Sequence, residues 1–426
     1  MIPIKEVMKT SAVRLHGAND IRLESFELPE LKNNEILMQV ITDSLCASTY
    51  KAVKQGTAHK RVPPDIAGNP IIIGHEMCGK IIKVGSAVKG WKVGQKAVIQ
   101  PALKLESGYD PGYSYPYIGG SATYVIVPEI VLQKNCLIHY NGENYFGGSL
   151  VESLACVIRG FKGFYHTDYT DYKRTDGAKK GGKLAILGGA GPMGIGAVEM
   201  GIGYVHCAQI VVTDFDQNRL DYANARCSTK EARKKGTDLY YINTSGMENV
   251  AEELLKVSDG GFDDVLVMAP VASLFSLAEK ICRTDGCINF FAGPPVHDLP
   301  GSLNLYRVYY DGIHVVGTAG STPSDMEEVI ELIEGDKINA GVLVSHICGL
   351  KAVPEAIMAM STPSGAKKVC YTNLDLPLIA LEDLSELGKT DTLYKKLDEI
   401  VKANGGIWNS DAEKYLLEHA PVLKNN

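Results

Sequence analysis

The spacing of hydrophobic positions changes near residue 183. Before it, short apolar runs alternate with glycine turns, a pattern typical of β-strands. Strands are expected over residues 36–41, 79–84, 96–99 and 122–127. A helix is expected from about Gly148 through Glu152 to Phe164. We therefore predict that the first part of the chain is β-rich.

After Lys183, continuous apolar runs are separated by helical stretches. These runs predict strands over residues 183–187, 209–213, 265–268, 287–291 and 314–317. Continuous apolar strands that alternate with helices are typical of a parallel, doubly wound sheet covered on both faces. The polar, turn-rich stretch before them, His166–Gly182, is expected to be a surface insertion.

The last third of the chain changes pattern twice. Thr322-Pro323 opens a helix with an acidic first turn, and a strand at 369–371 is expected to close the fold. From about Asp375 the pattern is an amphipathic helical pair, and Ser410-Asp411-Ala412-Glu413 predicts a capping box for its last helix. The expected domains are 1–155, 156–318, 319–373 (a return to the first domain) and 374–426 (a helical extension).

Composition excludes several classes of protein. A chain of 426 residues is too long for one core, and its formal charge of -7 argues against bulk binding to nucleic acid or anionic membranes. Residues Met1–Glu6 lack the apolar run of a signal peptide, and no run of about 18 apolar residues follows. The ten cysteines form no Cys-x-x-Cys pair, so we expect a cytoplasmic protein without a disulfide framework.

A glycine-rich turn, Gly189-Ala190-Gly191-Pro192-Met193-Gly194, lies between a predicted strand and a predicted helix. Gly189 would allow the tight turn, Gly191 the approach of a pyrophosphate, and Gly194 close packing. The helix N-terminus would offer free N–H groups to the phosphates. The alternative is a glycine-rich turn in an unrelated α/β protein.

Asp214, twenty residues after Gly194, ends the next predicted strand. A carboxylate there accepts hydrogen bonds from ribose hydroxyls and repels a 2′-phosphate, which favours NAD over NADP. Arg219 either covers the adenine ring or is an exposed helix arginine.

Three potential metal ligands precede this turn. Cys46 follows the first long predicted strand, and His75-Glu76 follows the apolar run Ile71-Ile72-Ile73. Such side chains are costly to bury without a partner. Catalytic zinc takes sulfur, imidazole or carboxylate ligands and keeps one position open. The alternative is a buried thiol beside a hydrogen-bonded His–Glu pair.

Several motifs occur in the order seen in the zinc-containing medium-chain dehydrogenases, which include sorbitol and threonine dehydrogenases. They are Cys46-Ala47-Ser48, Gly74-His75-Glu76, Val93-Gly94 and the glycine-rich turn. The chain resembles that family over roughly residues 10 to 372. The resemblance implies an α/β protein with a GroES-like catalytic domain and a Rossmann domain.

The resemblance also implies the metal ligands. Cys46, His75 and Glu152 would be zinc ligands or near-ligands, with Glu152 matching the family's Glu-Pro-Leu element. Glu76 matches an acid that ligates zinc in polyol dehydrogenases and lies just behind it in others. Which of Glu76 and Glu152 contacts the metal stays open.

The chain departs from the family pattern at several positions. Residues 100–135 lack the four cysteines of a structural zinc lobe, so one zinc per chain is expected, and a tyrosine-rich segment, 108–117, replaces the lobe. Thr49 replaces an Asp, which puts one hydrogen bond behind the metal ligands in doubt. Lys51 stands where a proton-relaying His is common.

The extension from Asp375 resembles that of the L-sorbose-1-phosphate reductases, which implies hydride transfer between NAD(H) and a sugar phosphate, L-sorbose 1-phosphate or D-glucitol 6-phosphate. In the implied reaction zinc polarises the substrate oxygen, Ser48 bonds that oxygen and passes its proton outward, and Glu76 assists. The nicotinamide would lie at the ends of late strands, beside Ala292, Gly293 and Thr318.

Substrate contacts are harder to predict. Lys51 is either a proton exit, a phosphate contact or a solvated lysine. His59-Lys60-Arg61 is either a phosphate contact or a solvated surface, and Arg159 and Arg307 are further candidates.

Other functions remain open. One is a dehydrogenase of an unphosphorylated polyol or amino alcohol. Another is an inactive nicotinamide-binding structural or sensor protein. We expect a homo-oligomer, a dimer or a tetramer, with no nucleic-acid or membrane partner.

Overall fold

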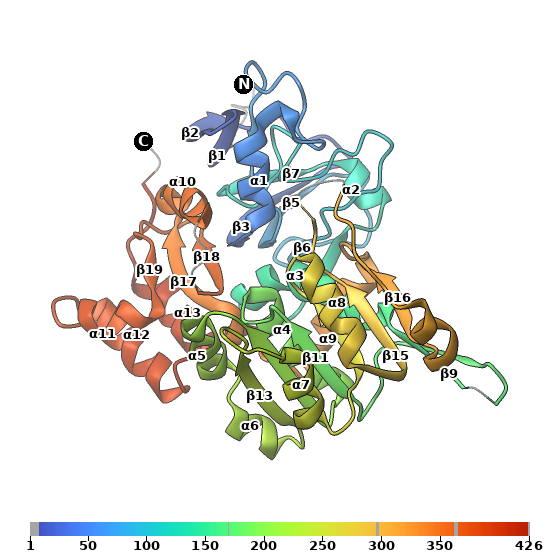
Figure 1. The fold of residues 1–426 in the computed structure, drawn as a ribbon. Helices are drawn as coiled ribbons and strands as arrows, with labels where there is room; N and C mark the ends of the chain where they lie inside the picture. Colours follow the sequence, from blue (N-terminus) through green and yellow to red (C-terminus); the bar gives the residue numbers. More distant parts are fainter. Residues whose placement is uncertain (1–7, 169, 295–297, 362–364, 425–426) are drawn as a thin grey trace, which may run out of the picture. The chain divides into compact units, whose positions relative to one another are not determined.

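The structure is a computed structural model that describes residues 8–168, 170–294, 298–361 and 365–424. The segment Met1–Glu6, on which the absence of a signal peptide was predicted, lies outside these residues. The chain divides into two compact units, drawn in Figure 1. Unit 1 comprises Met1–Glu152, Thr322–Glu334 and Val344–Asn426, and unit 2 comprises Ser153–Ser321 and Gly335–Leu343.

Unit 1 is built on an eight-stranded sheet. Its strand order is β19-β17-β18-β3-β5-β6-β8, and β7 also pairs with β3. The strands are β3 (Ile36–Leu45), β5 (Met77–Val84), β6 (Lys96–Ile99), β7 (Tyr124–Val127), β8 (Leu137–Tyr140), β17 (Val344–Gly349), β18 (Lys367–Tyr371) and β19 (Ile379–Ala380). The strands expected at 36–41, 79–84, 96–99 and 122–127 are therefore present, and β3 lies at the centre of the sheet.

Alternation explains why β3 takes this place. Ile36, Met38 and Val40 point to one face and are fully buried in a cluster with Ile81 and Val125. A smaller sheet, β2-β1-β4, was not expected. It comprises β1 (Lys9–Gly17), β2 (Asp20–Glu27) and β4 (Ile71–Ile72). The α-helices of unit 1 before its extension are α1 (Ala47–Gln55), α2 (Glu129–Gln133), the first part of α3 (Phe146–Gly163), α9 (Pro323–Glu334) and α10 (Val353–Met358).

Unit 2 contains the predicted doubly wound sheet. Its six strands are all parallel, in the order β13-β12-β11-β14-β15-β16. They are β11 (Lys183–Leu187), β12 (Gln209–Asp214), β13 (Asp238–Asn243), β14 (Phe262–Val267), β15 (Cys282–Phe290) and β16 (His314–Gly317). The connecting helices are α4 (Pro192–Met200), α5 (Gln217–Arg226), α6 (Thr229–Lys234), α7 (Val250–Ser258) and α8 (Ala272–Ile281).

The strand order places the end of β11, where the chain enters the glycine-rich turn, near the middle of the sheet. Ala185 and Leu187 pack in one buried cluster with Leu254 of α7 and Ala278 of α8. Because all six strands run the same way, their carboxyl ends share one edge, where open α/β sheets bind ligands.

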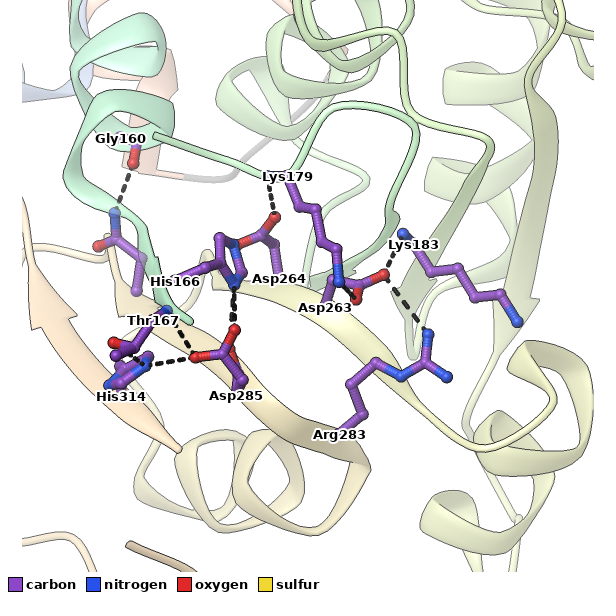
Figure 2. A network of polar contacts seen from close by, with 11 residues as sticks. Gly160, His166, Thr167, Lys179, Lys183, Asp263, Asp264, Arg283, Asp285 and His314 are labelled. Carbon is purple, nitrogen blue, oxygen red and sulfur yellow. Dashed lines mark hydrogen bonds and ion pairs between the residues drawn. The ribbon is translucent and has the colours of Figure 1, made fainter. Parts of the chain in front are cut away.

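The hairpin of β9 (Tyr165–Thr167) and β10 (Arg174–Asp176) begins the segment expected to be a surface insertion. That expectation is wrong for His166, which is only 9% exposed. Its Nε2 lies 3.2 Å from Asp264 Oδ1, and its Nδ1 lies 3.0 Å from the carbonyl oxygen of Asp285 (Figure 2). Asp285 also accepts from the Thr167 amide at 2.8 Å, so the network fastens the hairpin to β14 and β15.

The C-terminal extension packs as a helical group beside β17–β19 within unit 1 (Figure 1). Its helices are α11 (Leu384–Leu387), α12 (Thr392–Ala403) and α13 (Ser410–His419). The predicted capping box is wrong, because Asn409 is the residue that caps α13 and its side chain accepts from the Ala412 amide. Glu413 is buried and bonds to another part of the chain.

None of the helices in the described ranges combines the length and apolarity that a membrane span requires.

Candidate active site

The candidate metal ligands lie where two strands of unit 1 end. Cys46 directly follows β3 and is the N-cap residue of α1, so the first turn of α1 carries Ser48 and Thr49. His75 and Glu76 lie between β4 and β5. Gly74 comes before them with φ +88°, and a Cβ there would lie 2.1 Å from Asp43 Oδ2, which only glycine avoids.

The structure brings Cys46, His75 and Glu76 together. One ligand atom from each lies within 4.8 Å of the others, and His75 and Glu76 are buried. A thiol, an imidazole and a carboxylate are the donor set that zinc prefers, and they converge from different loops. The chemistry of these donors therefore fits a zinc ion.

Both ring nitrogens of His75 have defined neighbours. Thr49 Oγ1 lies 3.2 Å from Nδ1, while Ser48 Oγ lies 3.3 Å from Nε2. Thr49, which replaces the family's Asp, therefore contacts the ring nitrogen of His75 and can supply the hydrogen bond behind this ligand. Ligating histidines are usually oriented by such a contact at the ring nitrogen that faces away from the metal.

Tyr113 is a site residue that the sequence did not predict. Its hydroxyl donates to Ser48 Oγ at 2.8 Å and lies 3.3 Å from His75 Nε2. It belongs to the segment 108–117 that was expected to replace the zinc lobe. Gly112 has φ +78°, and a Cβ there would lie 2.0 Å from the Gly74 carbonyl oxygen, so glycine allows this segment to approach the ligand loop.

Lys367 is the second residue that the sequence missed. It comes from β18, and its Nζ donates to Glu76 Oε1 at 2.6 Å and to Oε2 at 2.7 Å. Both side chains are buried. Burial alone would raise the pKa of Glu76, but the charge and hydrogen bonds of Lys367, together with His75 and Ser44, hold that pKa below its usual range.

The free thiol of Cys46 holds its proton. Burial raises the pKa of Cys46 to about 11, although the charge of Lys367 opposes the rise. Ser48 Oγ also donates to Cys46 Sγ at 3.0 Å. A metal ion has to displace the thiol proton before it binds, as for other cysteine sites.

Glu152 and Lys51 are less closely involved. Glu152 lies on α3 (Phe146–Gly163) and is half-buried; its charge influences the pKa of Cys46, Tyr113 and Lys367. Its carboxylate is nevertheless not among the three groups within 4.8 Å in the described part of the chain. Lys51 is exposed on α1.

The glycine-rich turn of unit 2 joins β11 to α4. Gly191 is the N-cap residue of α4 and Pro192 its first residue. Gly188 has a positive φ of +66°, and a Cβ on Gly189 would lie 2.5 Å from Ile186 Cγ2, so the tight turn needs glycine at both positions. Gly194 must be glycine because a Cβ there would lie 1.8 Å from the Gly189 carbonyl oxygen. The first turn of α4 also contains Met193.

Asp214 ends β12 beside this turn. Its Oδ2 accepts from the Ala190 amide at 3.3 Å, and its Oδ1 accepts from the Phe215 amide at 2.9 Å. Arg219 Nη1 lies 3.8 Å from Asp214 Oδ2. The acid and the arginine therefore both lie at the glycine-rich turn, as the cofactor prediction requires.

The remaining predicted cofactor residues follow β15 and β16. Ala292 is buried, and Gly293 is exposed. Thr318 Oγ1 donates to Asn289 Oδ1 at 3.2 Å. Asn289 Nδ2 in turn donates to the Gly160 carbonyl at 2.8 Å, so Thr318 is held beside the second half of α3 (Figure 2).

Comparison with known proteins identifies the family. Residues 32–135 match the family model described as "Alcohol dehydrogenase GroES-like domain", and residues 192–335 match "Zinc-binding dehydrogenase". The mannitol-1-phosphate 5-dehydrogenase of Aliivibrio fischeri is 42% identical over 417 residues, 97% of this chain and 99% of the relative. The L-sorbose 1-phosphate reductase of Klebsiella pneumoniae is 40% identical over 424 residues, 98% of this chain and 99% of the relative.

A solved structure agrees with the fold. The 2R,3R-butanediol dehydrogenase of Bacillus subtilis superimposes with a TM-score of 0.70 at 21% identity, covering 85% of this chain and all of that one. At this identity the likeness concerns the fold, while the family models and the two relatives carry the assignment. The chain therefore belongs to the zinc-containing medium-chain alcohol and polyol dehydrogenases, and it is an oxidoreductase.

Proposed function

We propose that this enzyme transfers a hydride between NAD(H) and a phosphorylated polyol or ketose, such as D-glucitol 6-phosphate or L-sorbose 1-phosphate. The observation that carries the proposal is the convergence of Cys46, His75 and Glu76 with Ser48 and Tyr113 in unit 1. The two relatives named for sugar-phosphate substrates also cover 97% and 98% of this chain. The residues of this chain that each alignment leaves out are fewer than the residues of the C-terminal extension. Both relatives therefore share most of that extension.

In this proposal Cys46 and His75 hold one zinc ion, and the two acids, Glu76 and Glu152, share the remaining ligand position. Glu76 is nearer, but Lys367 bonds both of its oxygens, so Glu76 must exchange Lys367 for the metal before it becomes a ligand. Glu152 would then ligate in the resting state. The metal would supply Lewis acidity at the substrate oxygen.

Ser48 and Tyr113 would handle the proton. Ser48 Oγ accepts from the Tyr113 hydroxyl at 2.8 Å, so Tyr113 would orient Ser48, and both hydroxyls would have to turn before a proton could pass outward from Ser48 to Tyr113. His59 stacks on the Tyr113 ring, with centroids 5.8 Å apart. Lys51 remains a candidate for the last step to solvent.

Cations near Tyr113 support a phosphate group on the substrate. Arg61 lies over the Tyr113 ring at 4.9 Å and pairs with Asp110 at 3.0 Å. Burial lowers the pKa of His59, and the charges of Arg61, Lys60 and Lys51 lower it further. Arg307 is a weaker candidate, because it pairs with Asp311 and Glu279 in unit 2.

For the cofactor, we propose NAD rather than NADP. The support is the carboxylate of Asp214, which is buried at the glycine-rich turn and would repel a 2′-phosphate. Thr318, Ala292 and Gly293 would border the nicotinamide, which carries the hydride.

The setting of the enzyme is also a proposal. We propose the domain limits 1–155, 156–318, 319–373 and 374–426 given by the sequence, and a cytoplasmic location. No disulfide joins cysteines of the described ranges, which supports a reducing compartment. Exposed Leu305, Tyr306, Tyr309 and Tyr310 beside the edge strand β16 support a homo-oligomer.

The test compares rates on D-glucitol 6-phosphate and D-glucitol with zinc-loaded enzyme and NAD. We expect kcat/KM to favour the phosphorylated substrate and Lys60→Ala to raise its KM by about tenfold, as for loss of one charged hydrogen bond. Lys54→Ala, an exposed lysine in the last turn of α1, is the matched control and should leave KM unchanged. Equal kcat/KM on both substrates would favour the unphosphorylated-polyol alternative.

A further inference from the structure

Glu413 is a buried acid that belongs to the extension but bonds to a different helix. It lies on α13 and is 2% exposed. Its Oε2 accepts from the Tyr145 amide at 2.6 Å, and its Oε1 accepts from the Phe146 amide at 2.8 Å. A buried carboxylate with two amide donors is a built contact rather than an incidental one.

The two amides belong to the N-terminus of α3, which begins at Phe146. The first N–H groups of a helix have no partner within the helix, and that end attracts negative charge. The first turn of α3 contains no acidic residue, so Glu413 supplies the carboxyl group from elsewhere in the sequence. Burial raises the pKa of Glu413 to about 7, and the two amide bonds oppose that rise. Asn144 adds a second link, because its Oδ1 accepts from the Gly147 amide and its Nδ2 donates to Ser410 Oγ.

Glu413 is itself held in place from β18. The Tyr371 hydroxyl donates to Glu413 Oε1 at 3.1 Å, and Trp408 Nε1 donates to that hydroxyl at 2.8 Å. Tyr371 and Trp408 are fully buried. Strand β18 also carries Lys367. The extension therefore contacts both α3, which carries Glu152, and β18, which carries Lys367.

The capped end of α3 lies close to a candidate metal ligand. Glu152 is six residues after Phe146, which is about 9 Å along a helix. If the first turn of α3 frays, this ligand is left within two turns of a loose helix end.

We propose that Glu413 is a positioning residue for the metal site: by capping α3 it fixes Glu152 relative to Cys46 and His75, so the C-terminal extension is a working part of that site. This inference rests on the proposed zinc site. It assigns to the extension a role in holding metal, through a residue that contacts neither metal nor substrate.

The test uses the full chain with cobalt(II) as the probe, because its visible spectrum reports the ligands directly. We compare Glu413→Gln, which keeps the shape but removes the charge and one acceptor, with Glu418→Gln, an exposed acid on the same helix. We expect Glu413→Gln to weaken cobalt binding by about tenfold and to change the spectrum, as for other residues that orient ligands. Glu418→Gln should match the wild type.

A double variant separates positioning from general stability. If Glu413 acts through Glu152, adding Glu413→Gln to Glu152→Gln should weaken cobalt binding no further. Additive losses, or a Glu413→Gln variant that melts earlier but keeps the wild-type affinity and spectrum, would overturn the inference. If Glu413→Gln does not fold, Tyr371→Phe takes its place, because it removes one donor to Glu413. We expect Tyr371→Phe to weaken cobalt binding and change the spectrum in the same way but by less. An unchanged affinity and spectrum in that variant would overturn the inference.

Failure of the metal site itself would look different. A wild-type protein that binds neither cobalt nor zinc would refute the proposed function together with the inference. A wild-type protein that binds cobalt with a spectrum insensitive to Glu413→Gln would refute the inference alone.

Discussion

Replacing Lys367 with Met should destabilise the metal-free protein strongly. Lys367 and Glu76 are 5% and 1% exposed, and the ammonium donates to both carboxylate oxygens. The substitution keeps the volume of the side chain but leaves the Glu76 charge buried without the Lys367 ammonium. Removing one member of such a pair costs about 3–5 kcal/mol.

The measurement is urea unfolding of the metal-free protein, with two comparisons. Lys351→Met breaks an ion pair of the same 2.6 Å length with Asp375, but those side chains are 50% and 38% exposed. Exposed pairs contribute about 0–1 kcal/mol, so this variant should unfold almost like the wild type. Lys367→Met combined with Glu76→Gln should recover most of the loss, because no charge is then left unpaired.

Zinc provides an independent check. In Lys367→Met the Glu76 carboxylate no longer bonds to Lys367, so saturating zinc should stabilise this variant more than it stabilises the wild type. If Lys367→Met loses no more stability than Lys351→Met in the absence of metal, the buried pair of Lys367 and Glu76 contributes no more to the free energy of unfolding than an exposed pair. The competition between Lys367 and metal for Glu76 would then have no basis.

Three further outcomes are expected. Cys46→Ser should abolish zinc retention, measured by metal analysis, while NAD binding followed by fluorescence stays near wild type; full activity would refute the zinc mechanism. Asp214→Ala should reduce the ratio of kcat/KM with NAD to that with NADP, and an unchanged ratio would count against its role. Burial alone would lower the pKa of His166, but Asp264 and Asp285 raise it above its usual 6.5. The contact therefore stabilises the fold at pH values below 6.5 at which Asp264 is still ionised, and loses its effect as pH rises through the raised pKa of His166. Wild type should therefore lose its stability advantage over His166→Gln between acidic and alkaline pH, and a constant difference would contradict this.

The parts of the fold that the sequence predicted are those set by local pattern. The parallel strands of unit 2 that were predicted contain continuous apolar runs, and the turn from β11 to α4 has its own glycine spacing. Strand β13 was missed because only one of its six residues is buried. Cys46 was found because it directly follows β3, and His75 and Glu76 because they follow the apolar run Ile71-Ile72-Ile73. All three belong to short motifs. The fold class and the core of the candidate site therefore follow from short segments.

The residues that were missed depend on contacts distant in sequence. Tyr113 lies 65 positions from Ser48, and Lys367 lies 291 positions from Glu76. Neither belongs to a local motif, so no spacing rule indicates it. The prediction for Glu413 was wrong for the same reason. The local sequence fits a capping box within α13, but the Glu413 carboxylate bonds to the N-terminus of α3.

The bond between Glu413 and the Phe146 amide has a consequence for the order of biosynthesis. The two residues are 267 positions apart. At about 5–20 residues per second, the ribosome adds Glu413 roughly 13–50 seconds after Phe146. During that interval the nascent chain already holds Cys46, His75 and Glu152, but the Tyr145 and Phe146 amides at the end of α3 lack the Glu413 carboxylate. Full engagement of metal is therefore expected after the extension has emerged, which makes cofactor loading a late step in maturation.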